Sequence, residues 1–128
     1  MNFMLFNLFS YTNSATNENS AGALQSFLIN PNGTLSKAID TISSGGDSPA
    51  FATALSTGAV AVMNYGSGNG RIIPTTSKGE TFKESESTIT FPPPIGGASH
   101  PHMALEYHNE IFVPDLVSIC GLLQTFEY

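Results

Sequence analysis

The feature that most constrains this 128-residue sequence is an internal repeat. Its matching segments lie about 46 to 52 residues apart, a spacing at which each repeat is one supersecondary unit. The matches, in chain order, are Thr41-Ile42 with Thr88-Ile89, Gly45-Gly46 with Gly96-Gly97, Pro49 with Pro101, and Val62–Asn64 with Val113–Asp115. Repeats of this length bury their apolar faces against one another, so the fold must be a stack of similar units.

Each repeat contains short apolar runs separated by turn residues. Phe51–Leu55 and Ala59–Asn64, for example, flank the turn Ser56-Thr57-Gly58. No stretch has the periodicity of an amphipathic helix, and short strands at this spacing indicate an all-β chain. Four short strands in a unit of about 50 residues are typical of a propeller blade. In each repeat we expect a Gly-Gly loop, Gly45-Gly46 or Gly96-Gly97, before the inner strand, which is the strand that lines the central channel of a propeller. The sequence therefore predicts a partial β-propeller of about two and a half four-stranded blades.

A stack this short is expected to expose its two outermost sheet faces. Propellers close with about four to eight blades, and open sheet faces favour assembly. We therefore expect self-association through the open blade faces.

The charge balance excludes several classes of partner. Ten acidic residues face four basic ones, which gives a formal charge of −6. Neutralising phosphates requires a basic patch, so no nucleic-acid or membrane partner is expected. The single Cys120 cannot build a disulfide framework or a structural zinc site. The apolar start, Met1–Phe9, is too short to span a bilayer and lacks a basic region, so we expect a strand there and a cytoplasmic protein.

The segment most suggestive of chemistry is Ser99-His100-Pro101-His102, at the step between two predicted blades. Loops from all blades converge at the mouth of a propeller channel, and histidine is suited to proton transfer near neutral pH. Two other interpretations stay open. The segment could be a polar loop that caps backbone groups. Alternatively, His100, His102 and Glu106 form a His-x-His-x-x-x-Glu pattern that resembles a cupin metal motif, although its flanking glycines are missing.

A second candidate for the same rim is Asn64-Tyr65-Gly66-Ser67-Gly68, which follows a predicted strand. This segment could line the channel mouth, or it could be only a glycine-rich turn.

Four segments together resemble the lactonase family of seven-bladed propellers. They are Gly45-Gly46-Asp47-Ser48-Pro49, Met63-Asn64-Tyr65-Gly66-Ser67-Gly68, Ser99-His100-Pro101-His102 and Phe112-Val113-Pro114-Asp115-Leu116. That family includes bacterial-type 6-phosphogluconolactonases and fungal carboxy-cis,cis-muconate cyclases, and the sequence looks most like a fungal branch named as isomerases. The resemblance covers roughly residues 11 to 116.

The resemblance implies an enzyme that opens or forms a sugar-acid or muconate lactone, a small-molecule lactone or carboxylate being its substrate. It implies a catalytic histidine, His102 or His100, with His102 favoured because it enters the inner strand. It also implies substrate contacts at Asn64, Tyr65 and Asp115, and neither metal nor cofactor. The family's usual Arg and Glu partners lie in later blades, and Arg71 does not match that Arg. The alternative is therefore a truncated, non-catalytic propeller fragment that only binds or assembles.

Two regions are expected on this basis, a partial lactonase-type propeller over residues 1–116 and a divergent tail over residues 117–128. The family pattern usually continues with Gly-Ala-Asp after Leu116, whereas this chain continues with Val117-Ser118-Ile119. We therefore expect that the tail is retained intron or a frameshift in a truncated gene product.

Overall fold

The computed structural model of the chain is built from antiparallel strands. It describes residues 7–12, 21–76, 80–84, 88–116 and 122–127. Those residues contain ten strands and no helix. The strands are β1 (Asn7–Thr12), β2 (Ala21–Leu28), β3 (Asp40–Asp47), β4 (Pro49–Ala54), β5 (Val60–Asn64), β6 (Asn69–Ile73), β7 (Thr88–Thr90), β8 (Leu105–Tyr107), β9 (Glu110–Asp115) and β10 (Leu122–Glu127). The all-β prediction is confirmed.

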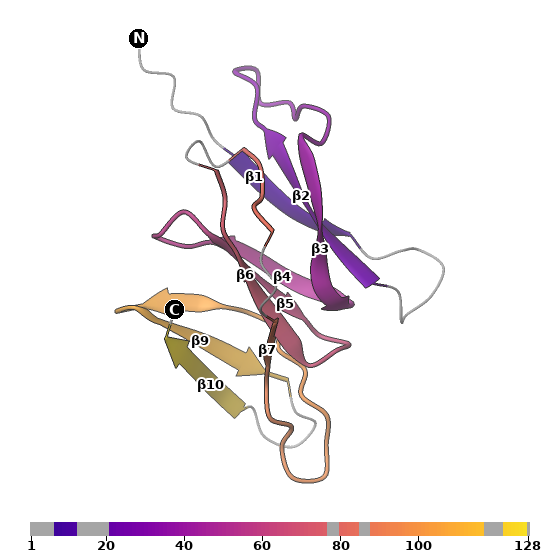
Figure 1. Cartoon of the computed structure of the whole chain (residues 1–128), viewed down its shortest axis with the longest axis vertical. Helices are drawn as coiled ribbons and strands as arrows, with labels where there is room; N and C mark the ends of the chain where they lie inside the picture. The colour runs from indigo at the N-terminus through magenta and orange to yellow at the C-terminus, as the bar shows by residue number, and fades with distance from the viewer. Residues whose placement is uncertain (1–6, 13–20, 77–79, 85–87, 117–121, 128) are drawn as a thin grey trace.

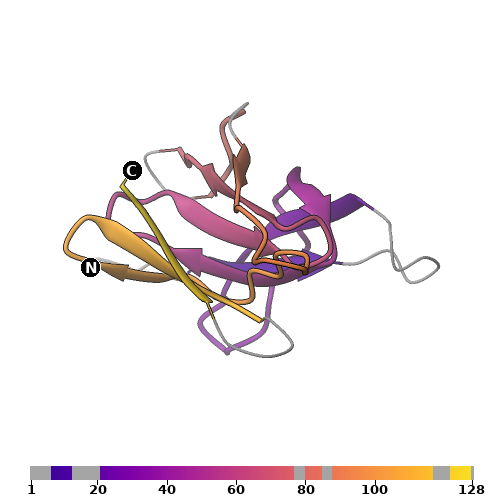
Figure 2. The same ribbon diagram turned by 90° about the horizontal axis from the view of Figure 1, so that it is seen from below.

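The strands form three sheets, in the orders β1-β2-β3, β4-β5-β6-β7 and β10-β9-β8. The four-stranded sheet is a complete antiparallel meander, and it lies between the other two (Figures 1 and 2). The sequence repeat places β3 with β7 as fourth strands and β5 with β9 as second strands. The order is therefore three strands of one blade, one whole blade and three strands of a third, which is the predicted two and a half blades.

The repeat is visible in the backbone contacts as well as in the sequence. Pro49 opens β4 opposite Asn64, and Pro101 forms the equivalent bridge to Asp115. Next to these pairs, Tyr65 N donates to Ser48 O at 3.0 Å and Leu116 N donates to His100 O at 3.0 Å. Both prolines are fully buried. The same junction is therefore built twice, and its second copy carries the histidines.

The core lies on both faces of β5. Val60 and Val62 pack towards the first sheet with Leu24, and Ala61 and Met63 pack towards the third sheet. Every residue of β5 is buried. A strand enclosed on both faces has no need for polar alternation, which explains the continuous apolar run. Burial on both sides holds the three sheets in fixed positions, and these positions determine which loops meet at the site.

One sequence-based expectation is wrong. Gly45-Gly46 was expected to form a loop before the inner strand, but both glycines lie within β3. Gly45 has a φ of +82°, and a Cβ on Gly46 would lie 2.5 Å from Asn69 Oδ1. The pair therefore lets β3 bend against β6 at close range. Only Gly96-Gly97, one repeat later, lies in a turn.

The C-terminal region contributes a strand. The predicted tail begins at Val117, and residues 117–121 and 128 lie outside the described residues. Residues 122–127 form β10, which pairs with β9 along its full length. The strand predicted over residues 1–9 is described only from Asn7, where β1 begins. Among the described residues there is no helix with the length and apolar character needed to cross a membrane.

Candidate active site between two blades

The candidate site forms where two neighbouring blades meet. One side is the turn after β5, which begins at Tyr65, and the other is the segment from Ser99 to His102 that leads to β8. Gly68 has a φ of +62°, and a Cβ there would lie 2.9 Å from Ser99 O. This close approach brings the two segments together although they are over 30 residues apart in the chain. The predicted glycine-rich turn is thus present, and it lies against the segment from Ser99 to His102.

Tyr65 contacts both histidines. Its ring stacks on the imidazole of His100, with centroids 4.3 Å apart and planes 16° apart. Its edge contact with His102 has a centroid distance of 5.9 Å and an interplanar angle of 89°. Stacked and edge-to-face pairs at these distances are the favoured geometries of aromatic rings. Three of the predicted site residues are therefore brought together.

The orientation of His100 is further defined by a polar contact. Its Nδ1 lies 3.0 Å from the backbone oxygen of Tyr65. A carbonyl oxygen can only accept, so a hydrogen bond in this contact requires the proton on Nδ1. In the neutral imidazole, Nε2 then holds the lone pair and can accept a proton. His100 is half-buried, whereas His102 is exposed.

Asp115 supports the histidine segment, Ser99 to His102, through hydrogen bonds from its side chain. Its carboxylate accepts hydrogen bonds from Ser99 Oγ at 2.5 Å and from His100 N at 2.6 Å. Asp115 is only 2% exposed. A buried carboxylate is tolerated when its oxygens accept hydrogen bonds. Here these bonds position the backbone at His100 and the side chain of Ser99. The substrate contact expected at Asp115 remains a prediction, and the contacts seen are those of a support for the loop.

Asn64 is also buried. Its amide nitrogen donates to Ser44 O at 3.0 Å and to Asn69 Oδ1 at 2.8 Å. Asn69 in turn donates to Gly45 O at 3.2 Å. These bonds tie β5 and β6 to β3 of the preceding blade. The substrate contact expected at Asn64 remains a prediction, and the residue lies at 0% exposure.

The metal pattern is not assembled. The carboxylate of Glu106 accepts hydrogen bonds from Ser56, one from the backbone N at 2.7 Å and one from the hydroxyl. Ser56 belongs to the turn between β4 and β5, so Glu106 joins two blades instead of facing His100 and His102 as a ligand. In the part of the chain that the structure describes, no three His, Cys, Asp or Glu side chains are grouped as metal ligands would be.

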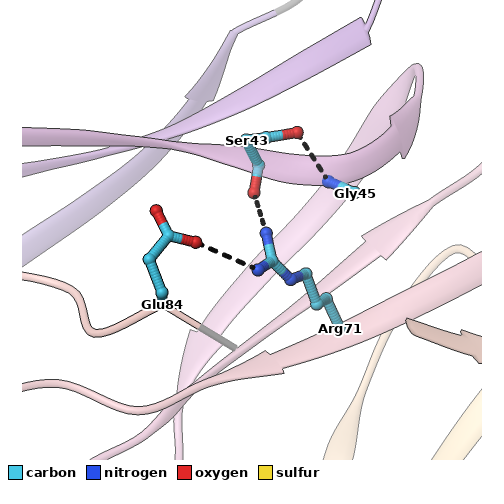
Figure 3. A network of polar contacts seen from close by, with 4 residues as sticks. All are labelled: Ser43, Gly45, Arg71 and Glu84. Atoms are coloured by element: carbon cyan, nitrogen blue, oxygen red, sulfur yellow. Dashed lines mark hydrogen bonds and ion pairs between the residues drawn. The ribbon is translucent and has the colours of Figure 1, made fainter. Parts of the chain in front are cut away.

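A buried polar contact that sequence reasoning missed is centred on Arg71. Its guanidinium donates to Ser43 O at 2.7 Å and lies 3.8 Å from Glu84 (Figure 3). Arg71 belongs to β6 and is 7% exposed, and its hydrogen bond to Ser43 reaches β3. The available signal was an arginine directly before the apolar pair Ile72-Ile73. This contact joins the central blade to the preceding one.

Fold and site together define a class of protein, the β-propellers that carry polar loops at the junctions between blades. A family model described as "Lactonase, 7-bladed beta-propeller" matches residues 7–118, which is most of the chain. The chain therefore belongs to the lactonase family of seven-bladed β-propellers. A search among curated proteins found no match.

Proposed function

We propose that the junction between the second and third blades is the acid–base part of a lactonase-type active site. Family membership supports lactone chemistry in general terms. The finer proposal is that the chain acts on a sugar-acid lactone, as 6-phosphogluconolactonases do, or on a muconate, as the fungal cyclases do. A small lactone or carboxylate in the cytoplasm is the proposed substrate.

The observation that carries this proposal is the hydrogen bond between His100 Nδ1 and the Tyr65 carbonyl. A general base needs a defined tautomer and a fixed direction, and this contact supplies both for Nε2. The backbone N of His100 is held at 2.6 Å by Asp115. For these reasons we assign the base to His100, although sequence reasoning favoured His102.

In the hydrolytic direction, His100 Nε2 takes a proton from water as the water oxygen bonds to the lactone carbonyl carbon. The acyl C–O bond of the ring then breaks, and the ring oxygen receives a proton from the imidazolium, which returns His100 to its starting state. The proton that is finally released to solvent is that of the product carboxylic acid. His102 is exposed and lies beside the same tyrosine. Cyclisation of a muconate would use the imidazolium form as the acid. A carboxylate oxygen of the substrate bonds to one alkene carbon while Nε2–H protonates the other, which leaves the neutral imidazole.

The test compares three histidine variants of the full chain with 6-phosphogluconolactone as substrate. We expect His100→Gln to lower kcat/KM at least 100-fold, the lower end of the usual contribution of general acid–base catalysis. His102→Gln should lower it about tenfold. His108→Gln is the matched control, because His108 stacks on Tyr107 outside the site. Equal rates for His100→Gln and the unmutated chain would refute the assignment of the base.

A second proposal is a non-catalytic role in binding or assembly, and an exposed sheet face favours it. Leu105 and Tyr107 lie on one face of β8 and are 54% and 59% exposed. Apolar side chains grouped in this way mark contact surfaces. This role predicts a rate no higher than the uncatalysed one in all four proteins and a mass in solution above that of one chain.

A further inference from the structure

The further inference concerns Tyr65 and rests on the proposed function of His100. Tyr65 follows β5 of the central blade, whereas both histidines belong to the segment that enters the next blade. Tyr65 thus contacts both imidazole rings from the neighbouring blade. A residue placed in this way can control both rings at once.

The backbone of the Tyr65 turn is itself fixed. Tyr65 N donates to Ser48 O at 3.0 Å, and Gly66 N donates to Asp47 O at 3.1 Å. Asp47 N donates back to Ser67 Oγ at 2.7 Å, which closes the turn onto the end of β3. The direction of the Tyr65 carbonyl is therefore defined by contacts that do not involve His100. Two constraints act on His100 from one residue, a stacked ring and a directed acceptor.

We propose that Tyr65 is a positioning residue that sets the tautomer and the ring orientation of His100. The other tautomer, with its proton on Nε2, would point the Nδ1 lone pair at the carbonyl lone pairs of Tyr65. The stacked ring prevents the imidazole from turning away to avoid this repulsion. Nε2 is therefore kept as the proton acceptor, and the site is active only when the two blades are correctly packed.

The first measurement needs no substrate. Nitrogen-15 NMR of histidine-labelled full chain at about pH 8, where histidine is mostly neutral, reports which ring nitrogen carries the proton. We expect the Nδ1–H form for His100, with the signal assigned by its loss in His100→Gln. The Nε2–H form in the unmutated chain would overturn the proposal.

The second measurement removes the ring. Tyr65→Ala keeps the backbone carbonyl but loses the stack, so the tautomer ratio of His100 should shift about 2- to 12-fold towards Nε2–H. Tyr65→Leu fills the volume without an aromatic ring and should give the same shift. It replaces the alanine variant in this test if that variant folds poorly. Tyr65→Phe keeps the ring and should keep the tautomer. A ratio unchanged in both the alanine and the leucine variants would refute the proposal.

Tyr107→Ala is the matched control, because Tyr107 stacks on His108 with centroids 4.0 Å apart and planes 11° apart. It should change only the signal of His108. With lactone as substrate, Tyr65→Ala should lower kcat about tenfold, as expected for a misoriented base. Failure of the two proposals can be told apart. An inactive site with the Nδ1–H tautomer rejects only the lactonase chemistry. An active site that keeps the Nδ1–H tautomer in both Tyr65→Ala and Tyr65→Leu rejects only the role of Tyr65.

Discussion

Asp115 and Ser99 form a buried hydrogen bond of 2.5 Å across the junction between β9 and the histidine segment. The same carboxylate accepts from His100 N at 2.6 Å, so one side chain fixes two successive residues. At the equivalent place one repeat earlier, Asn64 donates to Ser44 O instead of accepting. The two junctions share a backbone pattern, but the side chain at the equivalent position donates in Asn64 and accepts in Asp115.

Asp115→Asn should destabilise the chain by about 1–3 kcal/mol. The amide keeps one accepting oxygen but turns a donor towards the Ser99 hydroxyl or the His100 amide, which leaves buried groups poorly paired. Ser99→Ala removes a single hydrogen bond and should cost about 1 kcal/mol. Urea denaturation followed by circular dichroism measures both values. Midpoints equal to that of the unmutated chain would show that this buried cluster does not support the junction.

Glu106→Ala should weaken the contact between the second and third blades by about 0.5–1.5 kcal/mol. The carboxylate accepts from both the backbone N and the hydroxyl of Ser56, and both bonds are lost. A double-mutant cycle with Ser56→Ala isolates the part carried by the hydroxyl, and a coupling energy of about 0.5 kcal/mol or more is expected. Strictly additive effects would mean that the two side chains act independently.

Gly46→Ala should destabilise the chain by about 1–3 kcal/mol because the added methyl group is overpacked. Its Cβ would lie 2.5 Å from Asn69 Oδ1 and 2.9 Å from Asn64 Cβ. Gly97→Ala is the control, because its nearest neighbour is Pro94 Cγ at 3.3 Å. That variant should stay within about 0.5 kcal/mol of the unmutated chain. The same loss in both variants would point to a general effect of replacing glycine.

The two partners of the contact in Figure 3 should differ strongly in their effects. Arg71→Met leaves the Ser43 carbonyl without its guanidinium donor and should cost about 1–3 kcal/mol. Glu84 is 88% exposed and lies 3.8 Å from the guanidinium, so Glu84→Gln should change the free energy of unfolding by less than about 0.5 kcal/mol. Denaturation of the two variants side by side checks this order. A larger loss for Glu84→Gln would reverse the assignment of the stabilising contact.

The fold could be predicted from the sequence because matching segments recur in successive blades. Pro49 opens β4, and Pro101 forms the equivalent bridge ahead of β8. The apolar run of β5 indicates a strand covered on both faces. The site was accessible only in part. His100, His102 and Tyr65 could be named from residue type and spacing, but their mutual contacts depend on how two blades pack, which no local pattern encodes.

What the sequence by itself determined was the unit of construction, since periodicity and turn residues act over a few neighbouring positions. The tertiary structure decided which side chains face one another across units. In the packed structure Asn64 and Asp115 are buried and support their loops through hydrogen bonds. Glu106 accepts hydrogen bonds from Ser56, and the ring of Tyr65 stacks on His100. The physical reason is that contacts between blades arise from packing of sheets over long sequence separations. Sequence patterns identify the side chains that could make such contacts. Which of these side chains come into contact depends on how the sheets pack.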